Sequence, residues 1–151
     1  MLIEADKRGR KEYGVRLAGG AGDELFTVPD NLYLIGMMNT ADRSLAMIDY
    51  ALRRRFSFVT LEPQLDNPKF LNDIASELKP LVAKVARLNE TIAADPSLGS
   101  GFRIGHSYFC GKGDAVPKAS EIVKYEIGPI LDEYWFDNAE KAKDEKDRLA
   151  L

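Results

Sequence analysis

The amino-acid sequence predicts an α/β fold in which residues 1–62 form part of a parallel sheet and residues 63–151 form an all-helical subdomain. Short apolar runs bounded by turn residues fill the first part, and a helical period separates two of them. Strand, helix and strand within about thirty residues are typical of a βαβ unit. After Pro63, by contrast, apolar residues recur at helical spacing.

The first elements predict a hairpin. Residues 13–17 and 24–28 are strand-like runs on either side of the glycine-rich stretch 18–23, and Pro29 ends the second run. Before them, residues 1–5 resemble the last turn of a helix, so we expect the chain to begin within a longer element.

The next elements predict the βαβ unit. Residues 32–38 are short and nearly all apolar, which favours a strand buried on both faces. From Ser44 a helical period begins, and residues 56–61 form the next strand-like run. The helical period puts four apolar residues on one face: Leu45, Ile48, Ala51 and Leu52.

The second half predicts helices. Apolar residues between 70 and 88 fall at helical spacing on both sides of Pro80, which indicates two amphipathic helices or one kinked helix. A glycine-rich segment, 98–105, follows. Residues 122–134 predict a helix bent or interrupted at Gly128-Pro129, and the charged tail 137–148 predicts a solvated helix.

Composition bounds the possible functions. With 151 residues and 45% hydrophobic residues the chain can build a core, and its net charge of −3 gives no general attraction to DNA or anionic membranes. Cys110 is the single cysteine, so an intramolecular disulfide is excluded and a reducing cytoplasm is expected. We expect no membrane segment, because no apolar run reaches the roughly 18 residues that a span requires. A signal peptide and a soft-ligand metal site are not expected either.

Polar residues follow the apolar run 32–38, where ligands of open parallel sheets bind. Asn39, Asp42 and Arg43 could there orient a water, polarise it and offset charge on a phosphoryl oxygen. The alternative is that Asp42 or Ser44 caps the following helix.

Three consecutive arginines, Arg53, Arg54 and Arg55, follow the predicted helix. Their side chains project in different directions, so they cannot share one task. One of them could serve a neighbouring subunit as an arginine finger, a device worth roughly 10³ to 10⁵ in rate. The alternative is a solvated basic helix end, which the helix dipole favours.

The glycine-rich segment presents two more candidates, Arg103 and His106, which could face a phosphate. A hydrogen-bonded structural histidine is the alternative for His106. The adjacent aromatic residues 134–136 are interpreted as core packing.

No Gly-x-x-x-x-Gly-Lys-Ser/Thr motif occurs in these 151 residues, and no apolar strand ends in Asp-Glu. Residues 111–114 contain Gly-Lys but lack the hydroxyl residue and the preceding glycine. We therefore expect this chain alone not to turn over nucleotide.

Three ordered motifs, residues 38–44, 50–56 and 104–109, together with the helix 122–136, strongly resemble the C-terminal portion of the McrB family. That family comprises the GTPase subunits of 5-methylcytosine-specific restriction systems, within the AAA+ superfamily. The resemblance implies a partial AAA+ P-loop NTPase-like sheet over residues 1–62 and a helical lid subdomain over residues 63–151. Three sheet strands would be missing, so we predict that residues 1–62 are unstable as an isolated monomer.

The resemblance also implies catalytic roles. Asn39 would be the sensor that orients the attacking water, and Asp42 and Arg43 would lie near the nucleotide at a subunit interface. Arg54 would be the arginine finger that acts on the neighbouring subunit.

Further residues would contact nucleotide from the lid or the interface. Arg53 and Arg55 are rivals of Arg54 for the finger, while Arg103 and His106 fall where a lid supplies its sensor contact.

The family implies GTP and Mg²⁺ in the intact protein, a hexameric ring, an McrC-type endonuclease partner, and DNA bound through domains absent from these residues. Two alternatives stay open: an ATP-using AAA+ protein of a related class, and a non-catalytic interaction module or gene remnant.

Overall fold

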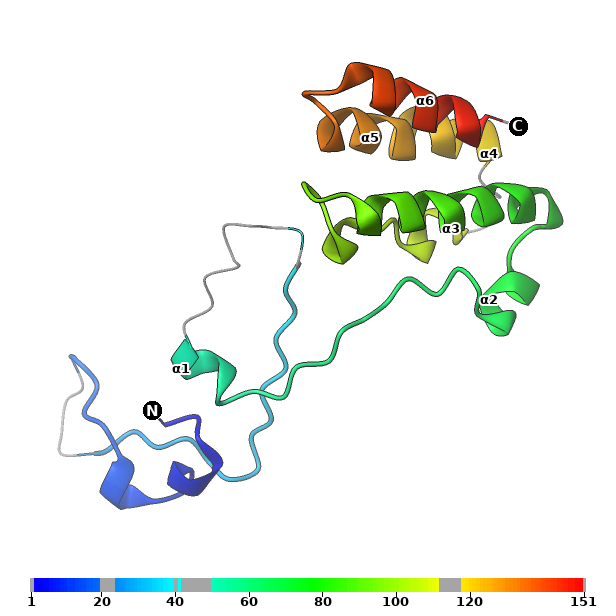
Figure 1. Cartoon of the computed structure of the whole chain (residues 1–151). Coiled ribbons are helices and arrows are strands. Elements are labelled where there is room, and N and C mark those ends of the chain that lie inside the picture. Colours follow the sequence, from blue (N-terminus) through cyan, green and yellow to red (C-terminus); the bar gives the residue numbers. More distant parts are fainter. Residues whose placement is uncertain (1, 20–23, 40, 42–49, 112–117, 151) are drawn as a thin grey trace. The chain divides into compact units, whose positions relative to one another are not determined.

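The computed structural model describes residues 2–19, 24–39, 41, 50–111 and 118–150. The chain divides into two compact units, Met1–Val59 and Thr60–Leu151. Figure 1 shows how the elements follow one another along the chain.

The first unit contains little regular structure in its described part: the 3₁₀ turns η1 (Ala5–Lys7) and η2 (Lys11–Tyr13) and the short helix α1 (Tyr50–Arg53). The predicted hairpin shrinks to a single antiparallel bridge, in which Val15 and Phe26 exchange backbone hydrogen bonds of 3.0 and 2.9 Å. The predicted helix from Ser44 lies outside the described residues as far as residue 49.

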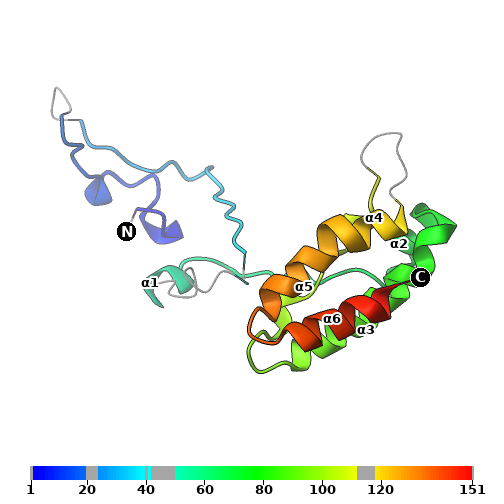
Figure 2. The ribbon, with the colours of Figure 1, turned by 90° about the horizontal axis from the view of Figure 1, so that it is seen from above.

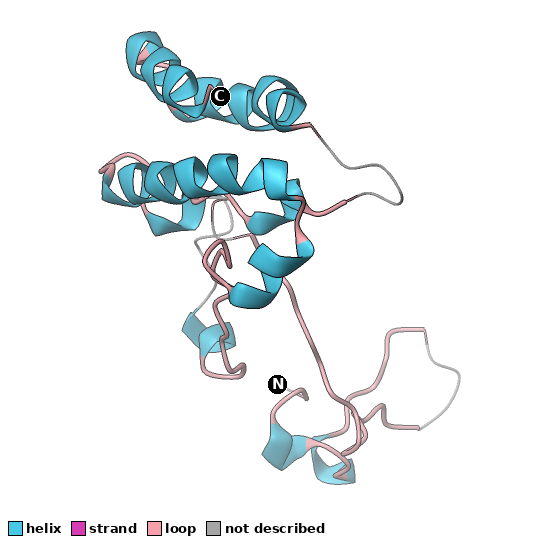
Figure 3. Ribbon diagram, turned by 90° about the vertical axis from the view of Figure 1, so that its right-hand side faces the viewer, coloured by secondary structure: helices cyan, strands magenta, loops and turns pink. Residues whose placement is uncertain are grey.

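The predicted sheet is wrong: no strand occurs among the described residues, as the secondary-structure colouring of Figure 3 shows. A strand requires a neighbouring strand to which its backbone is hydrogen-bonded, and residues 32–38 and 56–61 pair with no strand in the described part of the chain. Their apolar side chains are accordingly open to solvent, with Ile35 93% and Met37 96% exposed. The prediction of a partial parallel sheet rested on the apolar pattern alone, and the strand pairing that defines a sheet is absent from the described residues.

The second unit is helical throughout its described regular structure, in agreement with the sequence. It begins with α2 (Pro68–Asp73), η4 (Ser76–Leu78) and α3 (Lys79–Ala94). Asn67 caps α2, because its side-chain oxygen accepts hydrogen bonds from the backbone N–H groups of Lys69 and Phe70. Pro80 stands in the first turn of α3, where its missing N–H costs nothing, so it begins this helix rather than kinking it.

After the turns η5 (Ser100–Phe102) and η6 (His106–Phe109), the chain forms α4 (Ala119–Glu121), the π-helical turn η7 (Ile122–Ile127), α5 (Gly128–Tyr134) and α6 (Ala139–Leu149). The predicted interruption at Gly128-Pro129 therefore takes the form of a widened π turn. Gly128 permits it, since a Cβ there would lie 2.7 Å from the carbonyl oxygen of Val123. In the described part of the chain no helix is long and apolar enough to cross a membrane.

The core of the second unit lies between α3, the η7–α5 segment and α6. Helix α6 packs against both α3 and α5, and Figure 2 shows the three running alongside one another. One face of α3 supplies a continuous apolar stripe at helical spacing, formed by Leu81, Val82, Val85, Leu88 and Ile92, all buried.

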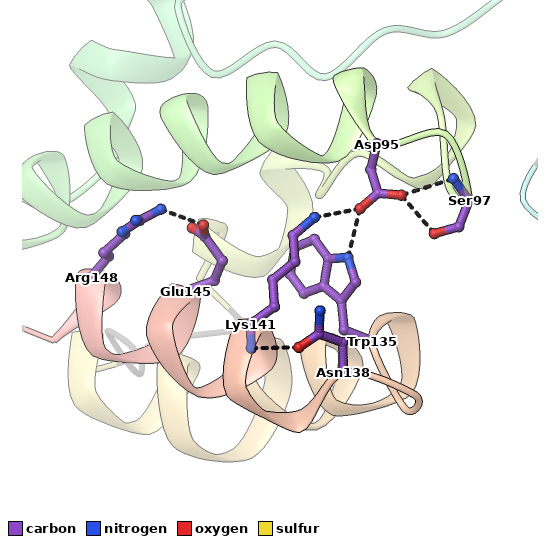
Figure 4. A network of polar contacts seen from close by, with 7 residues as sticks. All are labelled: Asp95, Ser97, Trp135, Asn138, Lys141, Glu145 and Arg148. Carbon is purple, nitrogen blue, oxygen red and sulfur yellow. Dashed lines mark hydrogen bonds and ion pairs between the residues drawn. The ribbon is translucent and has the colours of Figure 1, made fainter.

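A polar network fastens the end of α3 to the α5–α6 corner (Figure 4). Asp95 accepts hydrogen bonds from the Trp135 indole N–H at 2.8 Å, the Lys141 ammonium at 2.5 Å and the Ser97 backbone N–H at 2.8 Å. These donors, led by Lys141, hold the pKa of the Asp95 carboxyl well below its usual range. Trp135 is buried as the sequence predicts, whereas the neighbouring Phe136 is 84% exposed and does not pack in the core.

Candidate functional site

The loop that carries Arg103 and His106 is anchored by Asn89. The Asn89 side-chain amide donates to the Ile104 carbonyl at 2.9 Å, and its oxygen accepts from the Ile104 N–H at 2.6 Å. Both residues are buried, so these bonds are shielded from water. Sequence reasoning missed Asn89, although a lone amide within the apolar stripe of α3 is the signal that could have identified it.

Arg103 leaves this loop toward the segment that precedes α2. Its guanidinium forms an ion pair with the Glu62 carboxylate, and its Nε donates to the Ser100 carbonyl at 2.9 Å. Both partners of the ion pair are partly exposed to solvent. Water therefore screens the pair, and exchanging Glu62 for another anion costs little.

His106 contacts the same segment two residues further on. Its ring Nδ1 accepts a hydrogen bond of 3.3 Å from the backbone N–H of Gln64. An accepting Nδ1 carries no proton, so in the neutral ring the proton resides on Nε2. The edge of the imidazole packs against Phe70, with ring centroids 5.5 Å apart and planes at 71°.

Together the two contacts bring Arg103 and His106 onto one short stretch of chain, residues 62–64. The hydrogen bond at Nδ1 agrees with the alternative that His106 is a hydrogen-bonded structural histidine. The same bond fixes the tautomer of the neutral ring, which leaves an N–H donor on Nε2. Within the described residues no hydrogen bond is formed by this Nε2. The loop thus carries a guanidinium and an imidazole N–H, both suited to anionic oxygens.

The other candidates belong to the first unit. Asn39 is exposed, and its side-chain oxygen accepts a hydrogen bond of 3.1 Å from the backbone N–H of Ala41. Asp42 and Arg43 lie outside the described residues, as does Ser44 with its suggested capping role.

The three arginines occupy three different environments. Arg53 is exposed and its guanidinium lies 5.9 Å from the centroid of the Phe58 ring. Arg54 is also exposed. Arg55 is held inside the unit: its Nε donates to the Glu4 carboxylate at 2.5 Å and its Nη1 donates to the Ala51 carbonyl.

Glu4 is the centre of that second arrangement. Hydrogen bonds from Lys7 and Arg55 lower the pKa of the Glu4 carboxyl to about 2. Arg55 therefore stabilises the first unit.

The family comparison places the candidate loop within a known domain. The family described as "McrB, alpha-helical lid domain" matches residues 80–143, which include Asn89, Arg103 and His106. The Type IV methyl-directed restriction enzyme EcoKMcrB subunit of Escherichia coli (strain K12) is 47% identical over an alignment of 154 positions, which covers 93% of this chain. The chain belongs to the McrB family. The resemblance to the C-terminal portion of that family is thereby confirmed.

A second relative is more distant. The Type II restriction enzyme BsuMI component YdiS of Bacillus subtilis (strain 168) is 31% identical over 70 residues, which cover 40% of this chain. The McrB-family chain spans 33% of the length of the E. coli relative, and its match covers 20% of the B. subtilis one. Glu62 and Gln64, which contact Arg103 and His106, precede the matched lid domain, because that match begins at residue 80.

The McrB family implies two ligands, a nucleotide and Mg²⁺, and the described residues offer donors for the first but no cluster of ligands for the second. Arg103 and His106 are donors of the kind that bind nucleotide phosphates. For Mg²⁺, no group of three or more His, Cys, Asp or Glu side chains that could hold a metal occurs among the described residues. Mg²⁺ in nucleotide sites is usually held by only one or two carboxylates together with substrate phosphates and water.

Proposed function

We propose that this chain supplies the sensor, arginine-finger and lid residues of a GTP-hydrolysing AAA+ translocase subunit in a restriction system for modified DNA. Membership of the McrB family and two relatives named as restriction enzyme components support the proposal. The observation that carries it is the Asn89-anchored loop, which holds Arg103 and His106 beside residues 62–64.

In this proposal the lid loop binds phosphate oxygens. Arg103 exchanges Glu62 for a phosphate, and the His106 Nε2–H provides a second donor a short distance along the loop. Both donors strengthen as the site loses water, because charge-assisted hydrogen bonds gain from a low local dielectric. Anchoring of the Ile104 backbone by Asn89 keeps the loop in place before the ligand arrives.

The remaining roles belong to the first unit. Asn39 orients the attacking water, and Asp42 and Arg43 act near the nucleotide at a subunit interface. Arg54 is the arginine finger, and Arg55, whose guanidinium bonds Glu4 and the Ala51 carbonyl, is one rival. Arg53 is the other rival.

The proposal extends to the assembly. The intact protein would bind GTP with Mg²⁺, form a hexameric ring, act with an McrC-type endonuclease and reach DNA through other domains. A cytoplasmic setting is supported by the single, exposed cysteine, Cys110.

A chimera tests the proposal. Replacing the matching third of the E. coli subunit by this chain should give a protein that hydrolyses GTP, with ATP as the parallel substrate. Arg54→Gln should lower kcat by about 10³ or more, because a missing finger removes charge stabilisation in the transition state only. Arg103→Gln should raise KM as well, because it removes a ground-state phosphate contact.

The matched control is Lys143→Gln, on an exposed position of α6, which should leave both constants unchanged. A folded chimera that hydrolyses ATP but not GTP would favour the related ATP-using class. Hydrolysis of GTP that is insensitive to Arg54→Gln and Arg103→Gln would refute the assigned roles.

A non-catalytic interaction module is the second candidate. The exposure of Tyr33, Ile35 and Met37, at 86%, 93% and 96%, favours it, because such apolar side chains usually find a partner. Adding the chain to the intact E. coli subunit distinguishes the two: a module changes the GTPase rate of the intact subunit when it is mixed in.

A further inference from the structure

A cavity of about 370 Å³ lies between α3 and α6. Lys84, Arg87 and Thr91 line it from α3, where spacings of three and four residues put them on one face of the helix. Glu145 and Arg148 line it from α6, and Leu88 and Leu149 add apolar surface. The volume lies in the range of small-molecule sites.

The cationic side chains of this α3–α6 cavity have more hydrogen-bond donors than the protein uses. The Lys84 ammonium, which has three donors, makes one hydrogen bond, to the Ala150 carbonyl. The Arg148 guanidinium, which has five donors, bonds the Glu145 carboxylate. Arg87 is exposed and forms no ion pair with any described residue.

The charges that line the cavity also favour an anionic ligand. Three cationic groups face one carboxylate, Glu145, whose side chain is only 8% exposed and already paired with Arg148 (Figure 4). The lining therefore carries an excess of two positive charges, on a chain whose net charge is −3. A local field of this sign concentrates anions at the cavity.

We propose that the α3–α6 cavity is a phosphate-binding site, separate from the loop of Arg103 and His106. Arg87 binds two phosphate oxygens with its planar guanidinium, Lys84 supplies a point charge, and the Thr91 hydroxyl donates a further hydrogen bond. Glu145 orients Arg148 at the rim. The phosphate comes either from a free polyphosphate or from a nucleic-acid backbone.

A titration of the 151-residue chain with pyrophosphate, followed through the amide NMR signals, tests the proposal. We expect saturable shifts at residues of α3 and α6, with a Kd at or below roughly 1 mM and independent of any shifts at the loop of Arg103 and His106. Arg87→Gln and Lys84→Gln should each weaken binding about tenfold, since each removes a charge-assisted hydrogen bond. Thr91→Val, which changes no charge, should weaken it by about three- to tenfold.

Lys143→Gln is the matched control, because Lys143 lies on α6 but does not line the cavity. It should change the affinity less than about twofold, a general charge effect alone. The absence of saturable shifts in α3 and α6 up to roughly 10 mM, or equal losses in the Lys143 and Arg87 variants, would overturn the proposal. Each variant is first checked for an unchanged Trp135 emission, which reports an intact fold.

A short DNA duplex distinguishes the two sources. Tighter binding of the duplex than of pyrophosphate, with the same loss in Arg87→Gln and a steep dependence on salt, assigns the site to a nucleic-acid backbone. Binding of pyrophosphate alone assigns it to a free polyphosphate. If neither ligand depends on Arg87, the cavity is not a phosphate site.

Discussion

The indole N–H of Trp135 donates a hydrogen bond of 2.8 Å to the carboxylate of Asp95, forty residues earlier in the chain. Lys141 shares the same carboxylate, and its ammonium lies 4.8 Å from the centroid of the indole ring. One carboxylate thus joins the end of α3 to α5 and to α6. Because Trp135 is the single tryptophan, its fluorescence reports directly on this junction.

Replacing Asp95 by Asn should destabilise the chain at pH 7 by about 1–3 kcal/mol, because the charge-assisted bonds to Lys141 and Trp135 weaken. The measurement is urea unfolding followed by tryptophan fluorescence. Lys146→Gln is the control, since it removes a more exposed ion pair, with Asp132, and should cost less than about 1 kcal/mol.

The same carboxylate predicts a dependence of stability on pH. The folded-state pKa of Asp95 is depressed below the ordinary value of 3.8, so its contribution is fully present above that value. It is lost as pH falls below 3.8 toward the folded-state pKa. The unfolding free energy of the native chain should therefore fall more steeply below pH 4 than that of Asp95→Asn, and parallel curves would contradict this assignment.

Replacing Asn89 by Ala should cost about 2–4 kcal/mol, because the buried N–H and carbonyl of Ile104 both lose their partners. Amide hydrogen exchange should locate the effect, with faster exchange at Ile104 than elsewhere in the loop. Glu90→Ala, on the exposed side of α3, is the matched control and should change stability by less than about 0.5 kcal/mol. A loop that keeps its protection in Asn89→Ala would refute the anchoring role.

The helices of the second half could be predicted from the sequence because a helix satisfies its hydrogen bonds within one segment. The apolar spacing from Leu81 to Ile92 alone indicates the buried face of α3. The π turn before Gly128 could not be predicted in form, since Gly-Pro predicts an interruption but not how the carbonyls regain partners.

The sheet expected in the first half could not be predicted reliably, because a strand depends on a neighbouring strand that the local sequence pattern does not specify. Residues 32–38 have the composition of a buried strand, yet Tyr33, Ile35 and Met37 are among the most exposed apolar side chains of the chain. The instability predicted for residues 1–62 as an isolated monomer stays a prediction. Arg103 and His106 were predicted from their residue types, whereas their contacts with Glu62 and Gln64 depend on segments some forty residues apart.

Replacing Glu62 by Gln should release Arg103 at little cost to the fold. The ion pair is partly exposed, so the unfolding free energy should change by less than about 1 kcal/mol. In the chimera with the E. coli subunit, the KM for GTP should fall, because the phosphate no longer competes with Glu62 for the guanidinium. Glu121→Gln, which removes the exposed pair with Lys118, is the control and should leave KM unchanged. A raised KM in Glu62→Gln would show that Glu62 positions Arg103 rather than competing for it.

Replacing Gly128 by Ala should destabilise the second unit by about 1–3 kcal/mol, because the new methyl group would lie 2.7 Å from the Val123 carbonyl oxygen. That carbonyl accepts the Gly128 N–H across the π turn, so relief of the clash must break or lengthen this bond. Gly105→Ala is the matched control: the nearest atom to its Cβ would be the Ser107 hydroxyl oxygen at 3.8 Å, an ordinary contact. Thermal unfolding of both variants measures the difference, and equal melting temperatures would mean that the π turn adapts without strain.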